Sequence, residues 1–243
     1  TAENVAEQWD ISRQQQDEFA VESHRRALAG IEAGHFAAEM APYEIEDGYP
    51  NLATGEIVTK KKLVSVDEGP RPGSTVEGLA RLRPVFRAGG PVTAANSSQM
   101  SDGAGAVILC SEKYLKDNNL EPMARFVTSA VAGVPADIMG IGPKFAIPKA
   151  LKQAGLKNDD MDWVELNEAF AAQSLAVLKD TPLDLEKVNP LGGAIALGHP
   201  LGATGAIRTA TALHGLKRTG GKYGMVTMCI GTGMGAAGII EAL

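Results

Sequence analysis

Three residues in the second half of the sequence carry side chains that can hold or move a proton: Asn167, His199 and Cys229. Each lies where a strand, a helix or a glycine-rich turn is expected to begin or end. An amide, an imidazole and a thiol together form a set that suits acid–base and nucleophilic chemistry. The first hypothesis is therefore a catalytic site of the Cys/His/Asn kind.

Asn167 stands between an apolar strand predicted at 161–167 and a helix predicted at 168–179. Asparagine is among the best N-capping residues, and Glu168 in the first helical turn would suit the helix dipole. On the sequence alone, a capping role for Asn167 is preferred to a catalytic one.

His199 lies in a glycine-rich run at 192–205, just ahead of a helix predicted at 203–218. Small neighbours let backbone or substrate approach the imidazole closely, and histidine titrates near neutral pH. A glycine-rich turn with an incidental histidine is the alternative, and a functional role is preferred. The other histidines occupy ordinary helical or loop settings and are interpreted as incidental: His24, His35 and His214.

Cys229 ends an apolar strand at 223–230 and precedes a glycine turn at 231–235, whose N–H groups could face a developing negative charge. A dinucleotide-binding fingerprint would need a helix and a second strand after these glycines, and the residues up to Leu243 leave no room for them. A buried structural cysteine is the alternative for Cys229 and the preferred interpretation of Cys110.

The composition argues against several other classes of function. A formal net charge of -6 opposes nucleic-acid binding, and no apolar run is long enough to span a membrane. One plausible histidine and a lone cysteine do not supply the three or four ligands of a zinc site, so no metal is predicted. The two cysteines fit no disulfide framework and indicate a reducing, cytoplasmic compartment.

The elements that must position these side chains alternate between strand and helix from about residue 92. The expected strands are 106–110, 124–133, 161–167, 223–230 and 236–243, and the expected helices are 145–155, 168–179 and 203–218. This alternation predicts an α/β fold with a sheet covered by helices. A glycine turn joins the last two strands, so they should form an antiparallel hairpin and make the sheet mixed.

The first part of the sequence is predicted to be organised differently. Residues 1–40 have helical spacing, with Ser12 as an N-cap and a stop at Gly30 or Gly34. From 41 to 92, prolines and glycines interrupt the chain and predict an irregular, exposed excursion. Only two short elements are expected there, a strand at 57–66 and a helix at 75–82.

The three segments resemble the C-terminal signature blocks of the thiolase family, in order and in spacing. They are NEAFA at 167–171, GGAIALGHPLGATGA at 192–206 and CIGTGMGAA at 229–237. Further similarity occurs at 1–8, 79–86 and 92–107, so the resemblance covers essentially the whole chain. ANSSQ at 95–99 is more similar to 3-ketoacyl-CoA thiolases than to the biosynthetic acetyl-CoA acetyltransferases.

The resemblance implies a layered αβαβα fold divided among three parts of this chain. Residues 1–100 would be an irregular loop domain over the active site, 101–121 a return segment of the N-terminal core half, and 122–243 the C-terminal half. Thiolases are longer at the N-terminus and carry their nucleophilic cysteine there, and neither Cys110 nor Cys229 matches its motif. The missing N-terminal half is therefore an expected partner, and a homo-oligomer, dimer or tetramer, is also implied.

The activity implied is that of an acyl-CoA C-acyltransferase with an acyl-cysteine intermediate. It would cleave a 3-oxoacyl-CoA with CoA, or run the reverse Claisen condensation, with CoA as a substrate and no other cofactor. By resemblance, His199 accepts the proton of the nucleophile and, with a water held by Asn167, binds the thioester oxygen. Cys229 would shuttle a proton at the substrate α-carbon, and the N–H of Gly231 would donate to an oxyanion hole.

Binding of the CoA thioester is assigned by the same resemblance to four residues: Ser98, Arg71, Met139 and Phe170. For Met139 and Phe170, packing in the core is an alternative that the residues leave open. The alternative function is a non-catalytic acyl-CoA-binding protein on a thiolase fold. Retention of the amide, imidazole and thiol favours catalysis, because a binder needs none of them.

Overall fold

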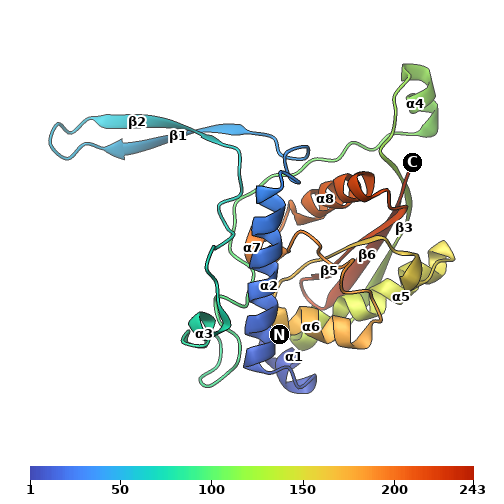
Figure 1. Ribbon diagram of the computed structural model, residues 1–243, viewed down its shortest axis with the longest axis horizontal. Coiled ribbons are helices and arrows are strands. Elements are labelled where there is room, and N and C mark those ends of the chain that lie inside the picture. Colours follow the sequence, from blue (N-terminus) through green and yellow to red (C-terminus); the bar gives the residue numbers. More distant parts are fainter.

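The computed structural model describes residues 1–243 and contains a four-stranded sheet with helices on both faces (Figure 1). The strands run in the order β3 (Ala124–Gly133), β6 (Met234–Ala242), β5 (Tyr223–Ile230) and β4 (Trp163–Leu166). β4 is parallel to β5, whereas β5–β6 and β6–β3 are antiparallel. The predicted mixed sheet and the C-terminal hairpin are therefore confirmed.

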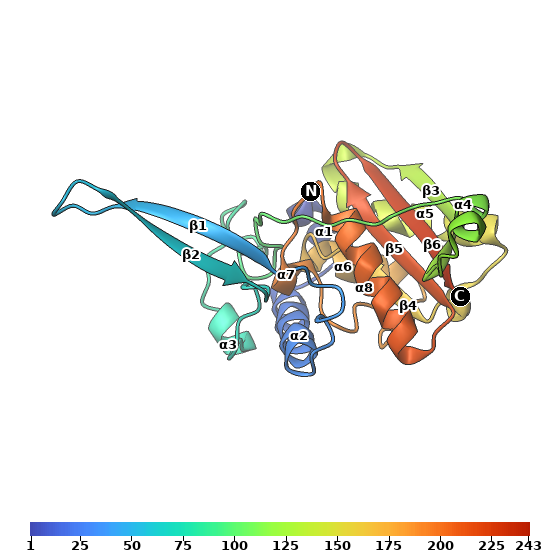
Figure 2. The ribbon, with the colours of Figure 1, turned by 90° about the horizontal axis from the view of Figure 1, so that it is seen from above.

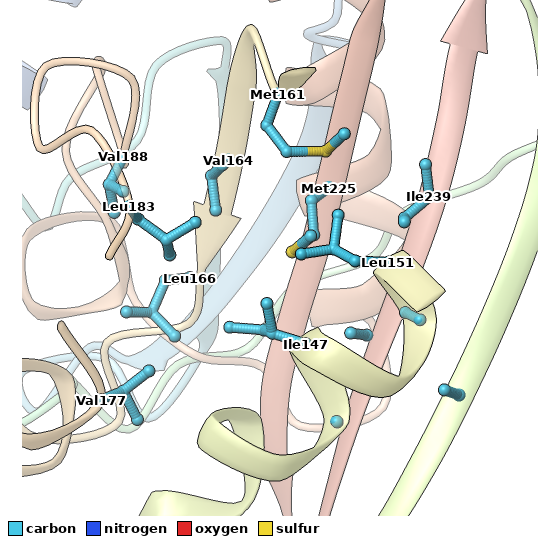
Figure 3. Packing of buried hydrophobic residues seen from close by; sticks show 14 residues of the cluster. Ile147, Leu151, Met161, Val164, Leu166, Val177, Leu183, Val188, Met225 and Ile239 are labelled. Carbon is cyan, nitrogen blue, oxygen red and sulfur yellow. The ribbon is translucent and has the colours of Figure 1, made fainter. Parts of the chain in front are cut away.

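Two layers of helices cover this sheet. α5 (Gly142–Ala154) and α6 (Ala171–Asp180) lie on one face, where Ile147, Leu166 and Met225 belong to the largest buried cluster (Figure 3). α8 (Thr204–Thr219) covers the other face, and its Leu216 packs with Trp163. Successive side chains of β4 point to opposite faces of the sheet, so they pack alternately against the two helix layers. This is expected of a strand that is buried on both sides.

A third group of helices packs outside α6. α1 (Ala2–Gln8) contacts α6, and α2 (Arg13–Glu32) contacts both α6 and the short helix α7 (Ala194–Leu197). The start of α2 confirms the predicted cap: Ser12 accepts from the Gln15 N–H, and the Gln15 side chain accepts from the Ser12 N–H. Four further short helices complete the fold: α3 (Val76–Leu79), α4 (Glu112–Asn118), η1 (Ala136–Ile141) and η2 (Asn158–Asp160).

A two-stranded hairpin projects from the helical side of the molecule (Figure 2). It pairs β1 (Tyr43–Pro50) with β2 (Ile57–Val64), and nearly all of its residues are exposed. β2 was predicted and β1 was not, because its glutamates, aspartate, glycine and proline have poor strand propensity. Pairing with β2 overrides that propensity, and the Lys61 ammonium lies 3.0 Å from the Glu44 carboxylate across the hairpin.

The predicted strand at 106–110 and the predicted burial of Cys110 are both wrong. Residues 101–110 form no regular element, and Cys110 is exposed. Ile108 and Leu109 are 94% and 82% exposed. A strand needs backbone partners, and no strand of this chain pairs with the segment, so its apolar side chains stay in solvent. None of the helices combines the length and apolar composition that a membrane crossing requires.

The contact between α8 and the sheet depends on Gly215. A β-carbon added there would lie 2.6 Å from the Trp163 ring, whereas one added at Gly205 on the same helix meets nothing closer than 4.0 Å. We expect Gly215→Ala in the full-length gene product to lower the free energy of unfolding by about 1–3 kcal/mol through overpacking. Denaturant titration measures this.

Gly205→Ala is the matched control, because it gains helix propensity without a clash and should be neutral or stabilising. Equal unfolding midpoints for the two variants would contradict the proposed packing of α8 against Trp163.

Candidate active site

Asn167 and His199 lie together beyond the carboxyl end of β4. The Asn167 Nδ2 is 3.3 Å from the His199 Nε2. The backbone of Asn167 is fixed on both sides: its N–H donates to the Thr227 carbonyl at 2.9 Å, and its own carbonyl accepts from the Gln173 amide at 3.2 Å. The structure thus brings two of the three predicted residues into contact and holds the first of them rigidly.

The preferred capping role of Asn167 is wrong. α6 begins at Ala171, and its N-cap is Phe170, whose N–H donates to the Gln173 side chain at 3.2 Å. The Gln173 side chain accepts the N–H at the start of α6, so the Asn167 side chain is not needed there and faces His199 instead. Asn167 is 1% exposed, and its Oδ1 is buried without a hydrogen-bond partner in the chain. This oxygen accepts no N–H from the start of α6, so Asn167 does not cap that helix.

Glu168 is also placed differently from the prediction. It lies outside the first turn of α6, fully buried, and its carboxylate accepts from Ser23 Oγ at 2.6 Å and Asn189 Nδ2 at 2.9 Å. A third bond comes from the Ile195 N–H at 3.3 Å. Burial raises the pKa of Glu168, and these donors oppose the rise. The carboxylate therefore ties α2 and the segment before His199 to the end of β4.

The imidazole of His199 is fixed from its other side by Thr204. The Nδ1 lies 2.7 Å from the Thr204 Oγ1, which in turn donates to the Pro200 carbonyl at 2.9 Å. Partial burial and the positive charge of Arg208 lower the pKa of His199 below its usual value. The ring is consequently neutral at neutral pH, which is the state that a general base requires.

Arg208 and Glu165 form a buried ionic pair on the α8 face of the sheet. Their side chains are 4% and 0% exposed, and Arg208 Nη1 lies 3.5 Å from a Glu165 oxygen. The Trp163 indole N–H donates to Glu165 at 2.7 Å. Burial raises the pKa of Glu165 to about 7, against the opposing influence of Arg208. Of the two residues, Arg208 helps to lower the pKa of His199. No sequence pattern singled out either residue.

Cys229 lies at the same edge of the sheet as Asn167. β4 and β5 are parallel, so their carboxyl ends meet there, and Cys229 is two residues beyond Thr227, the partner of the Asn167 N–H. Its sulfur makes no hydrogen bond to Asn167 or His199. Burial raises the pKa of the Cys229 thiol to about 11, so the group is a protonated acid at rest.

Gly231 opens the turn between β5 and β6. It is exposed, and no other atom lies within 4 Å of the position that a β-carbon would occupy. The turn then passes through two residues of positive φ, Thr232 (71°) and Gly233 (102°). The Cα of Gly231 therefore faces open space on its side-chain side.

Two of the four residues assigned to CoA binding lie beside the Asn167 segment. The Ser98 N–H donates to the Ala169 carbonyl at 2.9 Å, and its neighbour Ser97 forms a β-bridge with Phe170. The Phe170 ring meets Phe86 edge-on, with 6.0 Å between centroids. Phe86 is itself 64% exposed, so this contact lies near the surface rather than in the core.

Arg71 and Met139, the other two residues assigned to CoA binding, lie in other parts of the fold. The Arg71 N–H donates to the Nδ1 of the buried His24 at 3.2 Å, so His24 has a structural partner. Met139 is half-buried in η1, and the next residue, Gly140, approaches Gln173, which holds Asn167.

Gln99 connects these regions and was not predicted as a site residue. Its amide Nε2 lies 3.0 Å from the Gly69 carbonyl, 3.1 Å from that of Ile195 and 3.0 Å from that of Ala196. One side chain thus joins the segment before Arg71, the Ser98 loop and the helix that leads to His199. The only signal in the sequence is its position in ANSSQ.

Comparison with known proteins gives the following matches. Residues 1–113 match the family described as "Thiolase, N-terminal domain", and residues 120–242 match "Thiolase, C-terminal domain". The 3-ketoacyl-CoA thiolase B, peroxisomal, of Rattus norvegicus is 51% identical over 242 residues, which are 99% of this chain and 56% of the rat protein. The 3-ketoacyl-CoA thiolase of Bacillus subtilis (strain 168) is 48% identical over 247 residues, 99% of this chain and 61% of that protein.

Solved structures agree over the whole chain. The acetyl-CoA acetyltransferase of Bacillus anthracis superposes with a TM-score of 0.93 at 46% identity, covering 100% of this chain and 59% of that one. The human mitochondrial 3-ketoacyl-CoA thiolase in complex with CoA superposes with a TM-score of 0.92 at 49% identity. The match covers 100% of this chain and 58% of that one. The chain spans somewhat over half the length of these relatives.

The raised pKa of Glu165 implies that the free energy of unfolding changes with pH. Its folded-state pKa, about 7, is above the ordinary value of 4.5. The stability that depends on this group is therefore complete below 4.5 and is lost as the pH rises through 7. Glu165→Gln cannot ionise, so we expect its free energy of unfolding to rise by about 2.5 kcal/mol relative to that of the wild type as the pH goes from 5 to 8.

Urea unfolding of both full-length proteins at the two pH values measures this difference. Asp184→Asn is the control for general charge effects, because Asp184 is exposed and takes part in no salt bridge. A difference between wild type and Glu165→Gln that stays constant with pH would show that the carboxyl is not titrating in this range.

Proposed function

Because this chain belongs to the thiolase family, we propose that it provides the loop domain and the acid–base half of an acyl-CoA C-acyltransferase. The reaction is the CoA-dependent cleavage of a 3-oxoacyl-CoA, or the reverse Claisen condensation. The observation that carries the proposal is the contact of Asn167 with His199, at the sheet edge where Cys229 also lies.

The nucleophile of the proposed reaction is a cysteine outside residues 1–243. Its thiol gives a proton to the His199 Nε2, and the thiolate attacks the 3-oxo carbon of the substrate. The bond between carbons 2 and 3 then breaks, leaving an acyl-cysteine and the enolate of acetyl-CoA. A neutral His199 with a lowered pKa is suited to the first proton transfer.

Cys229 completes the proton balance. Its protonated thiol supplies the hydrogen that the enolate carbon needs to become acetyl-CoA, and the incoming CoA thiol then returns a proton to Cys229. The CoA thiolate attacks the acyl-cysteine and releases the shortened acyl-CoA, while His199 returns its proton to the nucleophile. The pKa of about 11 keeps Cys229 protonated until the enolate forms.

We assign the stabilisation of negative charge on the substrate oxygens to two groups of hydrogen-bond donors. The His199 ring binds the thioester oxygen together with a water held by Asn167, which accords with the buried, unpartnered Oδ1 of Asn167. The N–H of Gly231 donates to the second oxyanion, and one such donor is typically worth about 3–4 kcal/mol of transition-state stabilisation. The CoA thioester itself acidifies the α-carbon, so the proposal needs no metal and no other cofactor.

Binding of CoA is proposed to involve Ser98 and Arg71, with Met139 and Phe170 shaping the pocket. The Gln99 bonds support this grouping, because they fix the Ser98 loop and the segment before Arg71 against the helix that leads to His199. A CoA complex is known for the human mitochondrial 3-ketoacyl-CoA thiolase that this chain resembles.

The division of the chain is also a proposal. Residues 1–100 act as the loop domain, 101–121 return to an N-terminal core half, and 122–243 form the C-terminal half of a layered αβαβα molecule. The exposed apolar side chains of Ile108 and Leu109 support a return segment that pairs with strands outside this sequence. A homo-oligomer and a cytoplasmic location, the latter supported by two unpaired cysteines, belong to the same proposal.

Exchange of the α-protons of acetyl-CoA with deuterated solvent tests the roles and the function together. The full-length product should cleave acetoacetyl-CoA or a longer 3-oxoacyl-CoA with CoA, and it should catalyse this exchange. Cys229→Ala should reduce exchange at least about 100-fold, because the proton carrier is gone, while acylation of the nucleophile stays measurable. Proton NMR and mass spectrometry measure the two events.

Cys110→Ala is the matched thiol control and should keep full exchange. Exchange at the wild-type rate in Cys229→Ala would refute the role of that residue. Binding of CoA thioesters without cleavage or exchange by the wild type would instead favour the non-catalytic binder.

A further inference from the structure

The position of the proton on the His199 ring can be inferred from its neighbours. Thr204 has a single hydroxyl hydrogen, and its Oγ1 lies between the Pro200 carbonyl at 2.9 Å and the His199 Nδ1 at 2.7 Å. When that hydrogen is donated to the carbonyl, the remaining short contact requires the ring to donate. The contact with Thr204 therefore indicates that Nδ1 carries a hydrogen.

The opposite side of the ring leads to the same assignment. The Nε2 faces the Asn167 Nδ2, which can only donate, at 3.3 Å. A hydrogen on Nε2 would place two donors against each other, whereas a lone pair there accepts the bond. Both neighbours of the ring are thus consistent with one neutral tautomer, Nδ1–H.

Thr204 is held in place for this contact. It is the first residue of α8, it is 1% exposed, and its own N–H donates to the Pro200 carbonyl at 2.9 Å. The Ala203 N–H donates to the same carbonyl at 2.8 Å. The tight turn from Pro200 to Thr204 therefore carries the hydroxyl back to the imidazole with little rotamer freedom.

We propose that Thr204 is a positioning residue that keeps His199 in the Nδ1–H tautomer, with the Nε2 lone pair directed to the reacting groups beside Asn167. The catalytic meaning of this tautomer rests on the proposed function. At rest the Nε2 lone pair accepts the long, 3.3 Å bond from Asn167 Nδ2, and in the reaction it exchanges that bond for the proton of the nucleophile, whereas Nδ1 is occupied by Thr204. After that transfer the imidazolium donates from Nδ1 to Thr204, and no hydroxyl has to turn during the reaction.

The tautomer can be measured without any turnover. In the full-length product labelled with ¹⁵N-histidine, long-range ¹H–¹⁵N NMR at pH 8 distinguishes Nδ1–H from Nε2–H, and loss of the signals in His199→Asn assigns them. We expect Nδ1–H in the wild type and in Thr204→Ser, which keeps the hydroxyl. Thr204→Val, similar in shape but without the hydroxyl, should shift His199 toward Nε2–H.

The same variants separate positioning from simple structural support. Thr204→Val should lower kcat for thiolysis about 100-fold with little change in KM, the loss expected when a general base is misdirected. Thr204→Ser should restore most of that activity. Thr209→Val is the matched control, because Thr209 lies on the same helix and its hydroxyl contacts only the Gly205 carbonyl, at 2.7 Å. It should keep both the tautomer and the turnover.

Nε2–H in the wild type, or an unchanged Nδ1–H tautomer in Thr204→Val, would overturn the proposal. If Thr204→Val fails to fold, the wild-type tautomer and the Thr204→Ser spectrum still decide it. Absence of thiolysis by a wild type that shows Nδ1–H would refute the proposed function and leave the assignment of the tautomer standing.

Discussion

The hydrogen bond from the Asn167 N–H to the Thr227 carbonyl is the interaction on which the candidate site depends. It extends the parallel β4–β5 ladder one residue beyond Leu166 and sets the register of the two strands at their carboxyl ends. That register places Asn167 at the edge where Cys229 closes β5. Parallel α/β sheets bind ligands beyond the carboxyl ends of their strands, and the site follows this rule. His199 meets Asn167 there from the short link between α7 and α8.

Buried polar contacts hold that arrangement. The Glu168 carboxylate accepts three hydrogen bonds inside the protein, and Gly193 is required beside it because any side chain there would overlap the carboxylate. Burying such a network costs free energy. Removing one partner leaves the other groups buried without hydrogen bonds, which destabilises the fold. In return the network fixes the relative positions of segments that lie far apart in sequence. The same reasoning applies to the buried pair of Arg208 and Glu165, and Arg208 also helps to lower the pKa of His199.

Much of the fold could be predicted because local signals agreed with tertiary packing. The Ser12 cap and the strands β3 and β5 are examples, since periodicity and capping act within a few residues. Asn167 was misjudged as a cap because a cap and a strand-end side chain look alike until the helix start is known. The segment at 106–110 failed for a different reason: its residues favour a strand, but no strand of this chain pairs with them. Thr204 and Gln99 were missed because their roles depend on distant carbonyls and on the His199 ring, which no local pattern reveals.

The central claim is that residues 1–243 supply the acid–base residues while the nucleophile lies elsewhere in the protein. Mass spectrometry of the acyl-enzyme tests it most directly: the full-length product is incubated with a 3-oxoacyl-CoA, quenched in acid and digested. The account predicts an acyl group on a single cysteine outside this sequence, with Cys110 and Cys229 unmodified. An acyl group on Cys229 or Cys110, at a level that matches turnover, would contradict it.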